Sequence, residues 1–343
     1  MIHLCENEDL QRQIEEFNMQ FACNCCIKYN ENILMPQVVK ESGTIYFSKR
    51  FSLIILLFII RPFYKTKLDK LMFLYFAVDL NIKNGYVENA RFLLNELLTE
   101  FEETKEFEPC CEFPNIYLNE TIGALLVHEM SHYKYFLYPE VKETEVNELK
   151  NEILDVCIPM GIRGMFLKFA LRKLKNDPLR LEELACDSTG VRFFAKQISS
   201  SCNRINKQEI SNAVEQLTRV FVNLQQVKNL EDLSTYTIKQ HIIDHVFDVY
   251  RVGNINMTLI NHMKEYTCQM IESMKSEIFD YNHTLLGMCK ICWDKLDYSY
   301  TLGAKNIYEL NEDENAEDAF HTIKKVFCRL STNMFDYFKS VIV

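Results

Sequence analysis

Apolar residues recur at intervals of three and four along most of this chain, which is the spacing of one face of an α-helix. Only nine glycines and seven prolines occur among the 343 residues, so few positions interrupt the pattern. Long helices are therefore predicted through most of the sequence. They are expected at Glu6–Glu16, Leu68–Val78, Val87–Phe101, Thr121–Tyr135, Glu140–Cys157, Met160–Lys175, Asp177–Phe194, Gln208–Lys228, Leu230–Val252, Asn256–Phe279, Thr284–Asp297 and Glu314–Val343.

Two stretches depart from this helical pattern. Gly43–Phe51 alternates in part and is rich in β-branched and aromatic residues, which predicts a strand. Ser52–Ile60 is almost entirely apolar, but it is shorter than the about 20 residues that a membrane-spanning helix needs. We therefore expect a core segment there and no transmembrane helix. The predicted fold class is mainly α, with a small β element that makes it α+β.

The clearest break in the pattern is Ile198–Lys207, which is rich in serine and asparagine. It predicts one domain over residues 1–200 and a helical C-terminal region over residues 201–343. With 48% hydrophobic residues, the chain can also bury the two regions as a single packed domain.

Composition excludes some classes of function. The formal net charge of -10 and the lack of a basic block disfavour nucleic acid as a partner. The 13 cysteines are scattered and no signal peptide is evident, which favours reduced thiols in the cytoplasm over disulfides. Cys23, Cys25 and Cys26 could form a structural zinc site with Cys289 and Cys292, but the irregular spacing favours small buried hydrophobes.

The candidate chemistry begins with the sequence HEMSH at residues 128–132, inside an apolar run. His128 and His132 are four residues apart, so on a helix both imidazoles project from one face and can bind a single ion. Glu129 follows the first histidine, where its carboxylate can take a proton from a metal-bound water. The pattern predicts two metal ligands and a general base.

Catalytic zinc sites usually have three protein ligands and leave one position to water. The helix predicted at Asp177–Phe194 offers Glu183 and Asp187, which are again four residues apart. Glu183 can bind the ion, and Asp187 can accept a hydrogen bond from the far nitrogen of a ligand histidine and so orient it.

HEMSH followed by ELACD at residues 183–187 resembles the gluzincin class of zinc metallopeptidases, in which two histidines and a downstream glutamate hold the metal. ELACD is most similar to the BlaR/MecR-type antibiotic-sensing peptidases. It is similar more loosely to the CAAX prenyl endopeptidases and heat-shock membrane proteases, which usually have alanine at the place of Cys186. The resemblance covers about residues 114–195. Those families are anchored by transmembrane helices, which are not expected in this chain.

The resemblance implies a zincin-like core that uses the residues already identified. His128, His132 and Glu183 are the implied zinc ligands, Glu129 is the implied base, and Asp187 supports a ligand. It also implies a strand beside the metal helix whose edge pairs with substrate, for which the candidates are Gly43–Phe51 and Asn115–Leu118.

Glu152 is an alternative third ligand, because its separation from His128 resembles that of the third ligand in thermolysin-like enzymes. However, Val156 stands where the acidic residue one turn later is required. The surrounding segment, residues 140–152, is rich in Glu and Lys, which is typical of a solvated helix. Glu183 is therefore preferred.

These observations predict a zinc-dependent metallopeptidase that hydrolyses a protein or peptide substrate. The alternatives are a non-catalytic, metal-binding regulatory protein of the same fold, another type of cytoplasmic HExxH peptidase, and a hydrolase of a different substrate class. His241 or His245 is a candidate for stabilising the oxyanion. Further candidate donors for that role are Tyr133, Tyr135, Tyr236 and Tyr250.

Overall fold

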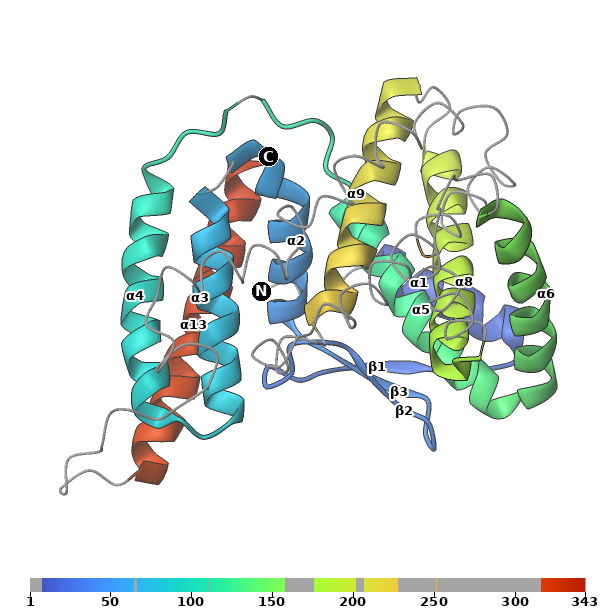
Figure 1. Cartoon of the computed structure of the whole chain (residues 1–343), viewed down its shortest axis with the longest axis horizontal. Helices are drawn as coiled ribbons and strands as arrows, with labels where there is room; N and C mark the ends of the chain where they lie inside the picture. The colour runs from blue at the N-terminus through green and yellow to red at the C-terminus, as the bar shows by residue number, and fades with distance from the viewer. Residues whose placement is uncertain are drawn as a thin grey trace, which may run out of the picture. The chain divides into compact units, whose positions relative to one another are not determined.

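The computed structural model describes residues 8–64, 67–110, 112–157, 176–201, 207–227, 251 and 316–342. Within these ranges the chain has nine helices and one small mixed sheet near the N-terminus, which confirms the mainly helical prediction (Figure 1). Every predicted helix that falls in these ranges is present. The helices are α1 (Glu8–Phe21), α2 (Lys49–Tyr64), α3 (Lys67–Lys83), α4 (Val87–Lys105), α5 (Leu118–Leu137), α6 (Pro139–Cys157), α8 (Pro178–Ser201), α9 (Lys207–Val227) and α13 (Ala316–Val341).

Several predictions concern residues outside these ranges. They are the helices Met160–Lys175, Asn256–Phe279 and Thr284–Asp297, all of Leu230–Val252 except Arg251, the middle of the Ile198–Lys207 break, and the side chains of His241, His245, Tyr236, Tyr250, Cys289 and Cys292.

The described residues group into two compact units. The first contains the described parts of residues 1–51, 117–218 and 237–276, and the second contains those of residues 52–116, 219–236 and 277–343. The candidate site lies wholly in the first unit. The division of the chain at residue 200 stays a prediction, because much of the sequence beyond it lies outside the described ranges.

A three-stranded sheet belongs to the first unit. β1 (Cys26–Tyr29) runs parallel to β3 (Thr44–Phe47), and β2 (Gln37–Val39) runs antiparallel to β3, in the order β1-β3-β2. The turn into β3 has Gly43 at a φ of +64°, a conformation that residues with a side chain rarely adopt. A strand was predicted here, and β3 confirms it.

The strand is shorter than Gly43–Phe51 because Ser48 begins a helix. Its hydroxyl accepts a hydrogen bond from the backbone N–H of Phe51 at 3.1 Å, as an N-cap residue does, and α2 follows directly. Both candidates for an exposed edge strand are wrong. β3 is the central strand, with a partner on each side, and Asn115–Leu118 leads into α5 without forming a strand. Of the two edge strands, β2 contacts α5.

The apolar segment Ser52–Ile60 lies in α2, and its residues from Leu53 onward are essentially inaccessible to solvent, which confirms the predicted core segment. In the second unit α2 packs on α3 through Phe58 and Phe76, whose ring centroids are 6.5 Å apart. α13 packs on α3 through Phe327 and Tyr75, whose ring centroids are 4.8 Å apart. Aromatic contacts between long helices thus contribute to the described core of the second unit.

Within the described ranges, every helix is too short or too polar to traverse a lipid bilayer.

Candidate metal centre

The candidate site lies where α5 and α8 cross at close range. Gly190 of α8 makes this approach possible, because a Cβ atom there would collide with the backbone carbonyl oxygen of Ala124 in α5. His128 follows Ala124 by one turn of α5, and Glu183 precedes Gly190 by two turns of α8, so each lies on the same face as its small neighbour. The missing side chain therefore lets the two functional faces meet.

α5 is buried on most sides, as its apolar sequence predicted. Leu126 and Met130 are inaccessible to solvent, and His128 is only 4% exposed. The start of α5 is held by α9, because the backbone N–H of Tyr117 donates to the side-chain oxygen of Gln216 at 3.0 Å. The helix that carries the HEMSH sequence is therefore a fixed part of the first unit.

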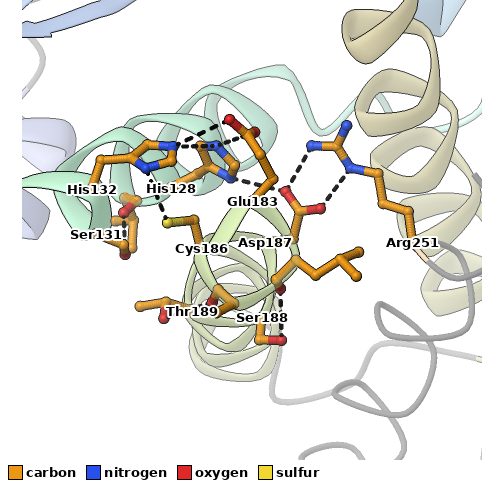
Figure 2. A network of polar contacts seen from close by, with 12 residues as sticks. His128, Ser131, His132, Glu183, Cys186, Asp187, Ser188, Thr189 and Arg251 are labelled. Carbon is orange, nitrogen blue, oxygen red and sulfur yellow. Dashed lines mark hydrogen bonds and ion pairs between the residues drawn. The ribbon is translucent and has the colours of Figure 1, made fainter. Parts of the chain in front are cut away.

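Three predicted ligands converge between these helices (Figure 2). The Nε2 atoms of His128 and His132 are 3.3 Å apart. Glu183 reaches both rings, with one oxygen 3.4 Å from Nε2 of His128 and the other 3.7 Å from Nε2 of His132. One ligand atom from each residue lies within 4.8 Å of the others, and in the described part of the chain this is the only such group of three acidic, histidine or cysteine side chains. The group could hold a metal ion.

The far nitrogen of His128 faces a buried carboxylate. Asp187 places Oδ1 2.9 Å from Nδ1 of His128. The same carboxylate is bound by Arg251 through two contacts, 2.6 Å from Nε to Oδ2 and 2.7 Å from Nη2 to Oδ1. Asp187 is inaccessible to solvent and Arg251 is 4% exposed, so this pair is enclosed by the protein. Sequence reasoning placed Asp187 next to a ligand histidine but did not find Arg251.

The far nitrogen of His132 also faces a carboxylate, and sequence reasoning missed it. Glu182 lies with Oε1 2.9 Å from Nδ1 of His132, and its other oxygen accepts a hydrogen bond from the ammonium group of Lys142 in α6. Glu182 is 6% exposed. The one available signal was a second acidic residue directly before Glu183 in a helix expected to be buried.

The charges of these groups follow from their partners. Burial disfavours a charged His128, but the carboxylates of Asp187 and Glu183 outweigh it and raise its pKa to about 9. Burial alone would raise the pKa of Asp187, yet Arg251 and His128 bring it below its ordinary value. Burial is likewise outweighed at Glu182, where His132 and Lys142 lower the pKa to about 2. Both supporting carboxylates are therefore anions at neutral pH.

Glu129, the predicted base, is half-buried in α5 next to His128. It contributes to the negative field around the thiol of Cys186, which lies 3.6 Å from Nδ1 of His132. Burial first, and then Glu183, Glu182, Asp187 and Glu129, raise the pKa of this thiol well above its ordinary value. Cys186 is thus a protonated, buried neighbour of the site.

The alternative ligand Glu152 lies in α6, but its side chain is outside the described residues. The preference for Glu183 rests on the position of its own carboxylate between the two rings. Tyr135, one of the candidate donors, is engaged elsewhere, because its hydroxyl donates to Glu145 at 2.5 Å.

Comparison with protein-family models, curated proteins and solved structures found no match to this chain.

Proposed function

We propose that this chain is a zinc-dependent metallopeptidase that hydrolyses peptide bonds in a protein substrate. The observation that carries the proposal is the convergence of His128, His132 and Glu183, whose ligand atoms lie within 4.8 Å of one another. This is the two-histidine, one-glutamate ligand set of catalytic zinc sites that keep a position open for water.

The spacing of the donor atoms fits zinc. A tetrahedral ion with metal–ligand bonds of about 2.0–2.1 Å separates its donors by about 3.3–3.4 Å. The imidazole nitrogens are 3.3 Å apart, and the two Glu183 oxygens lie 3.4 Å from Nε2 of His128 and 3.7 Å from Nε2 of His132, so a small shift of the carboxylate would complete this spacing. Each histidine directs Nε2 to this point and has a carboxylate at Nδ1, which is the usual support of a metal-ligating histidine.

Each residue then has a defined task. When bound, zinc supplies a Lewis acid that makes water acidic near neutral pH and polarises the scissile carbonyl. Glu129 accepts the proton of the attacking water and delivers it to the leaving amine. Asp187 keeps the imidazole of His128 in the orientation and tautomer that leave Nε2 available.

The second candidate is a metal-binding regulatory protein that retains this fold without catalysis. It requires the same three ligands but gives no task to Glu129, so the intact glutamate favours the enzyme. A hydrolase of another substrate class would use the same site chemistry.

One experiment separates these candidates. The purified protein and Glu129→Gln, both loaded with zinc, are incubated with cell lysate, and new protein N-termini are identified by terminal-amine proteomics. We expect cleavages made by the parent and absent with Glu129→Gln. Cleavage by neither protein, with zinc bound to both, would favour the regulatory candidate.

Cleavages shared by both proteins would come from a contaminating protease. Omission of zinc from the parent is the matched control, and it should abolish the same cleavages as Glu129→Gln.

A further inference from the structure

We infer that Glu182 and Lys142 form a second positioning pair, which holds the ligand histidine His132 and connects it to α6. The inference rests on the proposed metal site. The two histidines share one pattern of contacts.

Each histidine of the site has the same chain of partners. His128 contacts Asp187, and Asp187 binds the cation Arg251. His132 contacts Glu182, and Glu182 binds the cation Lys142. In both cases a carboxylate oxygen lies 2.9 Å from Nδ1, and Nε2 is directed toward Glu183. The pairs Asp187–Arg251 and Glu182–Lys142 thus orient the two ligand histidines in the same way.

Burial explains why Glu182 needs Lys142. The side chain of Glu182 is 8% exposed, and a carboxylate removed from water at this depth requires a charged or hydrogen-bonding partner on each oxygen. His132 satisfies Oε1 and Lys142 satisfies Oε2. With both partners in place the carboxylate has a fixed direction, and it fixes the ring of His132 in turn.

The cations of the two pairs, Arg251 and Lys142, differ in solvent exposure. The Arg251 side chain is 4% exposed and binds Asp187 through two nitrogens, whereas the Lys142 side chain is 36% exposed and binds Glu182 through its one ammonium nitrogen. Loss of Lys142 should therefore cost less stability than loss of Arg251, because water can reach the space that this partly exposed side chain leaves and solvate the freed oxygen of Glu182. It offers a clean way to test how α6 influences the metal site.

Glu182 is a positioning residue and not a zinc ligand, because its carboxylate is directed at Nδ1 of His132 and the other ring nitrogen faces Glu183. Its loss should free the His132 ring to rotate or change tautomer. Residues that orient metal ligands typically contribute about 10–100-fold to metal affinity. The same range is expected here.

The test is zinc affinity, measured by competition with a chromophoric chelator in the full-length protein. Glu182→Met, which removes the acceptor, should weaken zinc binding by about 10–100-fold. Glu182→Gln keeps an acceptor without the charge and should fall between Glu182→Met and the parent. Lys142→Met should weaken zinc binding, whereas Lys142→Arg, which keeps a cation at this place, should retain most of the parental zinc affinity. Lys150→Met makes the same change elsewhere in α6 and should bind zinc as the parent does.

A second measurement does not need the metal. Imidazole ¹⁵N NMR of the metal-free protein at neutral pH should find a proton on Nδ1 of His132 in the parent and Lys142→Arg. In Glu182→Met the proton should redistribute between the two ring nitrogens. This readout would not respond to a purely structural role of α6.

The outcomes separate this inference from the proposed function. If the parent binds zinc and both Glu182→Met and Lys142→Met bind it equally well, the pair does not position His132 and the inference is wrong, while the zinc site stands. If the parent binds no zinc, the proposed function is wrong. In that case an unprotonated Nδ1 of His132 in the parent would also overturn the positioning role.

Discussion

Arg251 binds both carboxylate oxygens of Asp187, although 64 residues separate them in the chain. Asp187 in turn contacts the ligand histidine His128 at 2.9 Å. The HEMSH helix therefore depends on a cation supplied from the C-terminal half of the sequence. Metal affinity and folding stability should respond together when this cation is removed.

Arg251→Met leaves the buried carboxylate of Asp187 without its cation. We expect a loss of about 3–5 kcal/mol in the free energy of unfolding, as for other buried ion pairs that lose one partner. Zinc affinity should also fall, because Asp187 no longer has a fixed direction toward His128. Urea unfolding and a zinc titration measure the two effects. The exposed Arg192 on α8 provides the control, and Arg192→Met should change stability by less than about 0.5 kcal/mol.

If Arg251→Met were as stable as Arg192→Met, the enclosed pair with Asp187 would have no energetic role. The support assigned to His128 would then have to come from another group.

Gly190→Ala tests the close approach of α5 and α8. The added methyl group collides with the carbonyl of Ala124, so the helices must separate, at about 1–3 kcal/mol of stability. Because Glu183 moves with α8, zinc affinity should fall as well. Gly85→Ala is the comparison, since it strains a residue with a φ of +74° in the second unit but meets no atom within 4 Å. It should destabilise the protein without weakening zinc binding, and equal effects on zinc would contradict this explanation.

The sequence predicted the parts of the fold that depend on local periodicity. The helices that carry His128 and Glu183 follow from apolar spacing within each segment, and residues four apart share a face wherever a helix forms. Glu182, Arg251 and Lys142 could not be found in this way. Their roles arise only after distant segments pack together, and a lone acidic or basic residue on a helix usually indicates a solvated face.

The prediction of an exposed edge strand was wrong for a similar reason. Composition identified β3 as a strand, but its place between β1 and β2 depends on pairing with segments that have weak strand signals of their own. Residues 140–152 were expected to form a solvated helix, and the residues of α6 up to Lys150 are indeed exposed or half-buried, except for Leu149. Its contacts through Lys142 and Glu145 were not foreseen.

The buried Lys134 of α5 predicts an asymmetry between two variants. Its ammonium group binds both oxygens of Glu145 in α6, at 2.8 and 3.0 Å, and its side chain is 2% exposed against 31% for Glu145. Glu145→Leu strands a buried cation, whereas Lys134→Met leaves a carboxylate that water can reach. We expect Glu145→Leu to be the more destabilising in urea unfolding, and the reverse order would contradict the assignment.

Glu129→Gln tests the base without disturbing the ligands. Turnover should fall by at least about 100-fold, since general acid–base catalysis typically contributes that much or more. Zinc content, measured by atomic absorption, should remain at the parental level. Retained turnover would mean that another group accepts the proton.

The central claim is that His128, His132 and Glu183 hold one metal ion. The most direct test is the zinc content of the purified parent, Glu183→Ala and Glu152→Ala after equilibration with zinc and removal of excess ion. We predict one zinc per chain in the parent and in Glu152→Ala, and loss of zinc from Glu183→Ala. Stoichiometric zinc in Glu183→Ala together with its loss from Glu152→Ala would contradict the account.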